Sequence, residues 1–72
     1  MENKIKDLKR LKLTSTMASN RASVQTDNSI LIITKITENT YKVKENSEVI
    51  AELKWKALEK LLSAYKIYSI NL

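Results

Sequence analysis

The chain contains neither glycine nor proline, so every tight turn must be made by residues that tolerate positive φ at a modest cost. Asparagine and aspartate are the residues that do so. They stand at each break in the hydrophobic pattern, namely Asn20, Asp27-Asn28, Glu38-Asn39 and Glu45-Asn46. We therefore expect these positions to separate the secondary-structure elements of the fold.

Three segments between these breaks have strand patterns. Residues 22–26 alternate, with Ala22, Val24 and Thr26 on one face. Residues 29–37 are rich in β-branched side chains and apolar on both faces at their start, which indicates a central strand. In residues 40–45, Tyr41 and Val43 are expected to face inward, opposite to the lysines between them. Two-residue hairpin turns join these strands, and the pattern predicts an antiparallel meander of three or four strands.

Two segments have helical patterns. Residues 2–11 predict a short amphipathic helix, because Ile5, Leu8 and Leu11 recur at i, i+3 and i+6. A competing strand pattern from residue 10 to residue 17 suggests that extended chain replaces the helix near residues 11–13. Residues 47–65 predict a long amphipathic helix capped by Ser47, and residues 66–71 predict either a last edge strand or an extended tail. We therefore expect one α+β domain over residues 1–72, with the long helix packed on the sheet.

Composition argues against catalysis. The chain has no histidine and no cysteine, which are the usual general base, strong nucleophile and zinc ligands, and it has no disulfide. Without glycine it also has no phosphate-cradling loop. The Ser-x-x-Lys string at residues 63–66 matches a serine acylase motif, but the other motifs of those enzymes are missing. We expect no enzyme activity, cofactor, metal or small-molecule substrate.

Length and apolar runs bear on assembly and location. The 72 residues form a small core of marginal stability, which favours association, and a homodimer is expected. The longest apolar run is Ile30–Ile33, far too short to cross a membrane. The first residues lack the apolar stretch of a signal peptide, so a cytoplasmic protein is expected.

The net charge is +5, and residues 1–12 hold +3 of it, which favours an anionic partner. One hypothesis is a nucleic-acid-binding regulator that uses the N-terminal basic helix and a basic sheet face. Its candidate residues are Lys4, Lys6, Lys9, Arg10, Lys12, Arg21, Lys42 and Lys44. The competing interpretation is that these lysines lie on ordinary solvated faces.

The leading hypothesis is a regulatory or inhibitory protein that occupies a surface of a protein partner. The apolar arc of the long helix is wider than packing on one sheet requires, and Trp55 lies at its edge. The candidate interface residues are Lys54, Trp55, Leu58, Leu62 and Tyr65. Coverage of this arc by the N-terminal helix and the C-terminal segment is the equally weighted alternative. The predicted layout and the lysine-, isoleucine- and asparagine-rich composition resemble some phage anti-CRISPR and host-takeover proteins, an analogy that no motif supports.

Overall fold

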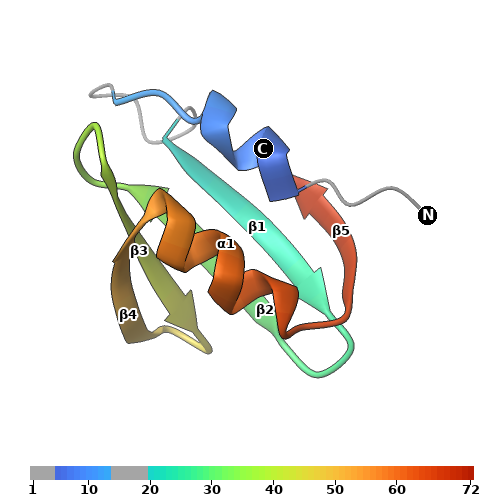
Figure 1. Cartoon of the computed structure of the whole chain (residues 1–72). Coiled ribbons are helices and arrows are strands. Elements are labelled where there is room, and N and C mark those ends of the chain that lie inside the picture. The colour runs from blue at the N-terminus through green and yellow to red at the C-terminus, as the bar shows by residue number, and fades with distance from the viewer. Residues whose placement is uncertain (1–4, 14–19) are drawn as a thin grey trace.

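A computed structural model describes residues 5–13 and 20–72 of the chain (Figure 1). It contains a 3₁₀ helix, five β-strands and one α-helix. In chain order these are η1 (Ile5–Arg10), β1 (Arg21–Thr26), β2 (Ile30–Lys35), β3 (Thr40–Glu45), β4 (Glu48–Lys54), α1 (Trp55–Ser63) and β5 (Ile67–Asn71). The predicted α+β class is confirmed.

The strands form one antiparallel sheet in the order β4-β3-β2-β1-β5. The predicted antiparallel meander is confirmed for β1 to β3, with β2 at the centre of the sheet as expected, and it continues into β4, whose residues had been predicted as helix. The residues after α1 form an edge strand beside β1, which resolves the alternative left open for residues 66–71. The connections at residues 27–28 and 38–39 also fall where the turns were predicted.

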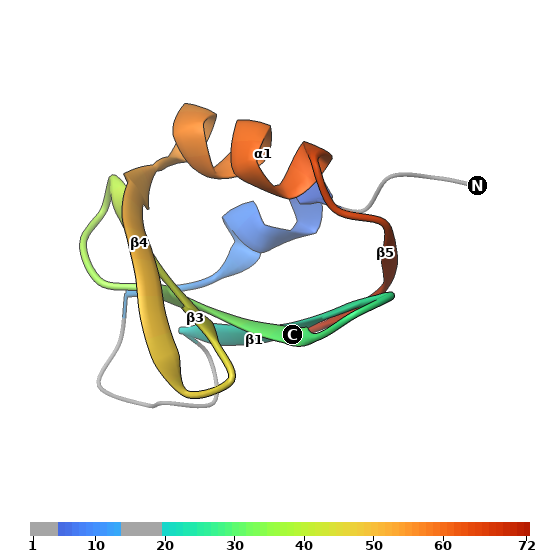
Figure 2. The ribbon, with the colours of Figure 1, turned by 90° about the horizontal axis from the view of Figure 1, so that it is seen from below.

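Both helices lie on the same face of the sheet, and the two edge strands rise toward them (Figure 2). The core between these layers combines residues from η1 and the chain just after it, from β1 to β3 and from α1. Its buried apolar members are Ile5, Leu8, Leu11, Ala22, Val24, Leu31, Ile33, Tyr41, Val43, Leu58 and Leu62. No other element of the described residues covers the opposite face, which we call the open sheet face.

The prediction of a helix starting at Ser47 is wrong, because residues 48–54 form β4. Asn46 and Ser47 adopt φ of 52° and 70°, which is the pattern of a type I′ hairpin turn. The turn reverses the chain, so that Ala51 and Leu53 pair with Val43 and Tyr41 of β3. The segment fits either period, and pairing with an existing strand decides in favour of β structure. The α-helix is therefore confined to Trp55–Ser63.

Replacing Ser47 with glycine is expected to raise the free energy of unfolding by about 0.5–1 kcal/mol, because glycine adopts positive φ without a Cβ penalty. Chemical denaturation of the variant measures this gain. The matched control is Asn28→Gly in the β1–β2 connection, since Asn46 and Ser47 are the only described residues with positive φ. The control is expected to lose a few tenths of a kcal/mol through added freedom of the unfolded chain. A loss of stability in Ser47→Gly would contradict the turn geometry.

Each edge strand contains a β-bulge. On β4, Val49 and Ala51 pair with adjacent residues of β3, which leaves Ile50 without an opposite residue. On β5, the same irregularity leaves Tyr68 unpaired. A bulge twists an edge and interrupts its hydrogen-bonding row, which disfavours pairing with a strand from a second copy. The sheet edges therefore offer little support for a dimer formed by strand pairing.

Candidate functional site

The 3₁₀ geometry of η1 sorts the N-terminal segment into three rows. With three residues per turn, side chains at i and i+3 lie one above the other. One row, Ile5 and Leu8, continues into Leu11 and is buried in the core. The next row, Lys6 and Lys9, continues into Lys12, and all three side chains are exposed. The expected α-helix is thus replaced by a tighter one, which aligns these lysines along one exposed edge.

The positive charge is concentrated on the helical side. We define the helical layer as residues 5–13 and 55–63. It holds six basic residues and two acidic ones, for a net charge of +4. The other described residues, 20–54 and 64–72, hold six basic and five acidic residues, for a net charge of +1. Eighteen residues therefore account for +4 of the net charge of +5.

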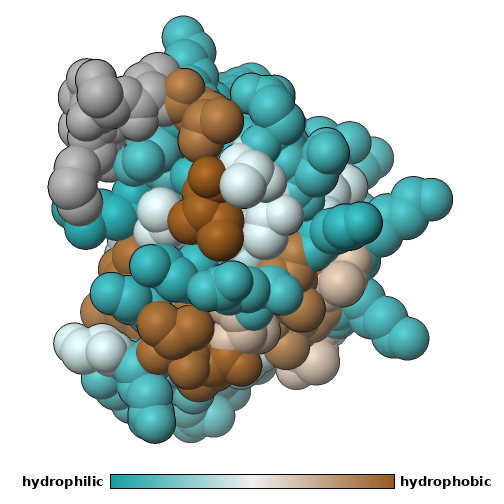
Figure 3. Space-filling model, turned by 90° about the vertical axis from the view of Figure 1, so that its left-hand side faces the viewer, coloured by the Kyte–Doolittle hydropathy of each residue, from teal (hydrophilic) through white to brown (hydrophobic). Residues whose placement is uncertain are grey.

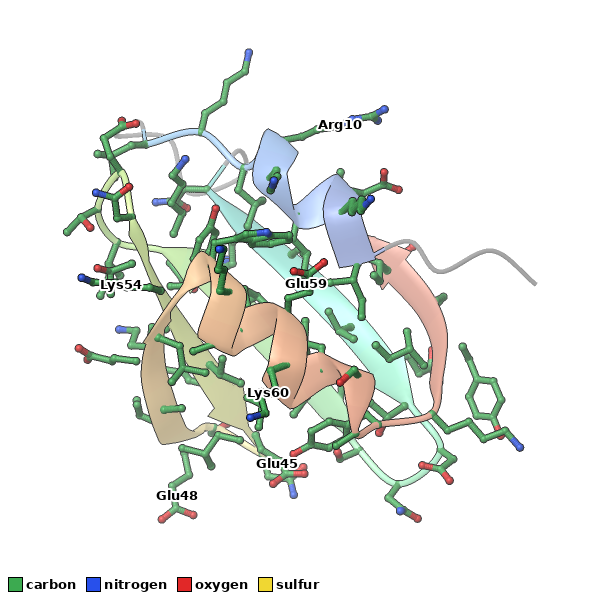
Figure 4. All side chains as sticks on the ribbon, viewed as in Figure 1. Arg10, Glu45, Glu48, Lys54, Glu59 and Lys60 are labelled. Carbon is green, nitrogen blue, oxygen red and sulfur yellow. The ribbon has the colours of Figure 1, made fainter. Side chains whose placement is uncertain are left out.

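This charge is not neutralised within the protein. No lysine or arginine in residues 5–13 and 20–72 forms an ion pair with a carboxylate. In Figure 4 the Glu59 side chain lies on the η1 side of α1, while Arg10 and Lys60 project outward. Glu59 is half-buried, whereas Arg10, Lys56 and Lys60 are exposed. The outer surface of the layer is consequently more basic than its composition implies.

Aromatic contacts join η1, α1 and β3 beneath this surface. The Nζ atom of Lys9 lies 5.1 Å from the centroid of the Trp55 ring, a cation–π contact. The Trp55 and Tyr41 rings are tilted by 57° with their centroids 5.8 Å apart. These contacts hold the lysine row of η1 beside the start of α1.

Lys35 joins the same cluster from the sheet. Its Nζ atom donates a hydrogen bond to the Leu11 carbonyl oxygen at 3.4 Å and lies 5.9 Å from the centroid of the Tyr41 ring. A cation near the last carbonyls of a helix is favourable, because those groups lack partners within the helix. Burial of Tyr41, with a smaller contribution from Glu38, raises the pKa of its phenol, so the side chain is neutral at physiological pH. Lys35 and Tyr41 therefore support the layer from below.

The residues proposed for a protein interface do not form one accessible surface. Leu58 and Leu62 are 0% exposed and belong to the core of a single subunit. Trp55 and Tyr65 are half-buried and pack against that core, and only Lys54 is exposed. The wide apolar arc was calculated for a helix that included residues 47–54, which are β4. What remains of the arc is covered by β3, β4 and η1. Leu58 and Leu62 therefore fit the alternative given at the outset, in which the apolar side of the helix is covered within the same subunit.

The residues proposed for nucleic-acid binding divide between two opposite faces. Lys6, Lys9, Arg10 and Lys12 lie in the helical layer, whereas Lys4 falls outside the described residues. Lys42 and Lys44 lie on the open sheet face, because their neighbours Tyr41 and Val43 point into the core. Arg21 lies on the same open face, because Ala22 beside it points into the core. One contact surface cannot use both groups at once.

The open sheet face is the weaker candidate of the two. Glu52 stands directly opposite Lys42 in the register, and Val49 stands opposite Lys44. Figure 3 shows the side of the molecule where β3 and β4 lie, with apolar side chains in patches separated by hydrophilic ones. Val49 and Ile50 are the exposed apolar residues of β4. The surface at β3 and β4 is therefore mixed, neither strongly basic nor continuously apolar.

Lys56 and Lys60 are the basic residues that sequence reasoning did not assign to the candidate site. They are four residues apart on α1, so they share one helix face, and both are exposed. Their spacing of four residues is visible in the sequence. They lie on an element that packs against η1, which carries the N-terminal lysines.

The described residues contain no group of three or more acidic side chains placed to hold a metal ion. None of the helices in residues 5–13 and 20–72 is long and apolar enough to cross a membrane. Comparisons with protein-family models, with curated proteins and with solved structures found no match to this chain.

Proposed function

We propose that this chain is a non-enzymatic regulatory protein that binds an anionic macromolecule through its helical layer. The observation that carries the proposal is that eighteen residues on one face hold +4 of the net charge of +5. The basic side chains there have no carboxylate partners among the described residues. A field of one sign on one face accelerates encounter with an oppositely charged partner and orients it.

A protein target remains part of this proposal, in the form of an acidic surface bound by the helical layer. The apolar interface first proposed on the long helix loses Leu58 and Leu62, because both are in the core. The homodimer was inferred from the small size of the core, and it stays a prediction. The charge of the layer is the stronger support for binding.

The test is retention on immobilised heparin, a polyanion that carries neither bases nor peptide. The double variant Lys56→Gln/Lys60→Gln is expected to elute at a lower salt concentration than the wild type, because it removes two exposed cations from the helical layer. The matched control is Lys42→Gln/Lys44→Gln on the open sheet face, which changes the net charge by the same amount. The control is expected to elute close to the wild type. An equal shift in both variants would show that only the total charge matters and would reject the helical layer as the binding surface.

A further inference from the structure

The helical layer contains two rows of exposed lysines with the same axial repeat. In η1, Lys6 and Lys9 are three residues apart, which is about 6 Å at a rise of about 2.0 Å per residue. Lys12 follows just after the helix. In α1, Lys56 and Lys60 are four residues apart, which is again about 6 Å at a rise of about 1.5 Å per residue. The backbone positions of the two lysine rows thus repeat at the same interval along two helices of different type.

This regular interval favours one class of anion. Phosphates along one strand of duplex DNA repeat every ~3.4 Å of helix axis, so lysines about 6 Å apart can each contact a different phosphate, and each contact releases condensed counterions. Carboxylates on a folded protein surface have no such constant repeat. Lys9 is fixed over Trp55 at the start of α1, so the two rows lie on neighbouring elements of one face.

The same surface lacks the groups that read bases. Residues 5–13 and 55–63 contain no asparagine or glutamine, the side chains that pair with adenine, and Arg10 is their only arginine. Trp55 is the one aromatic residue of the layer, and its ring already contacts Tyr41 and Lys9. Stacking on an unstacked base would require it to leave these contacts.

We infer that the ligand of the helical layer is the phosphate backbone of a nucleic acid, bound without sequence selection by Lys6, Lys9, Lys12, Lys56 and Lys60. The inference rests on the proposed function and names the ligand class of the same surface. Contacts to phosphate position a protein on a duplex but carry no sequence information.

The test is fluorescence anisotropy of two labelled DNA duplexes of unrelated sequence, titrated with the full chain at several salt concentrations. Five phosphate contacts predict that log K falls with log salt with a slope of about −4.5, equal for both duplexes. The Lys56→Gln/Lys60→Gln variant is expected to reduce the slope by about 1.8, and to bind roughly 60-fold more weakly at about 0.1 M salt. The Lys42→Gln/Lys44→Gln control is expected to keep the wild-type slope.

Three results would overturn the inference. The first is an unchanged slope in the Lys56→Gln/Lys60→Gln variant, and the second is an equal change in the control. The third is the absence of duplex binding at about 50 mM salt, where such contacts are strong. If heparin retention still depends on Lys56 and Lys60 in that third case, the proposed function stands and its target is an acidic protein. If that dependence is also lost, both proposals fail.

Discussion

Truncation of Leu62 to alanine is expected to lower the free energy of unfolding by roughly 2–5 kcal/mol. Leu62 is 0% exposed on the inner face of α1, where it packs in the single core of the protein. A domain of 72 residues has a total stability of roughly 4–11 kcal/mol, so this loss is a large fraction of the whole. Urea denaturation followed by circular dichroism measures it.

The matched control is Leu61→Ala, the same truncation at the adjacent position of the same helix. Leu61 is half-buried and packs at the margin of the core, so its loss is expected to be about 1 kcal/mol. Equal losses in the two variants would contradict the orientation of α1. A partner-binding role for Leu62 makes the opposite prediction, namely weakened association with little change in stability.

The strands could be predicted because alternation and turn chemistry agreed with each other. Residues 40–45 form β3 with the predicted bounds and the predicted inward face. Central placement of β2 was predicted from its β-branched, apolar sequence, although only one of its faces is covered and Ile30 is 49% exposed. The asparagine positions located the turns because a chain without glycine has few other residues for them.

Residues 48–54 could not be assigned from the sequence, because their apolar positions fit both a helix and a strand. Strand pairing with Tyr41 and Val43 decides the structure of this segment. These are tertiary contacts, which the local propensity of the segment does not predict. The apolar arc of the long helix, and the interface inferred from it, depended on this assignment. Because the start of the helix was predicted wrongly, Leu58 and Leu62 were assigned to a binding surface, whereas the structure places them in the core.

The candidate site was predictable only in part, for a similar reason. The N-terminal lysines were identified by charge, but their alignment depends on the 3₁₀ form of η1. Spacing of Ile5, Leu8 and Leu11 by three residues fits that form and is also compatible with an α-helix. Grouping these lysines with Lys56 and Lys60 requires knowing that η1 and α1 share one face of the sheet, which is a tertiary property.

Truncation of Leu8 to alanine is expected to lower the free energy of unfolding by roughly 2–4 kcal/mol. Leu8 is 0% exposed and lies in the middle of the buried row of η1. A six-residue 3₁₀ helix has little stability of its own, so burial of this row is what holds it in place. Urea denaturation should be followed both by circular dichroism and by the fluorescence of Trp55, over which Lys9 is placed. Coincident transitions are expected, because η1 contributes to the same core as the sheet and α1.

Leu13→Ala is the matched control, because Leu13 belongs to the same segment and is 46% exposed. Its truncation is expected to change stability by less than about 0.5 kcal/mol. If Leu8→Ala proved as mild as Leu13→Ala, η1 would be only a loosely attached segment. The lysine row would then have no fixed position beside Lys56 and Lys60. The lysine rows of η1 and α1 can act as one phosphate-binding surface only while the buried apolar side chains of η1 hold this helix in place.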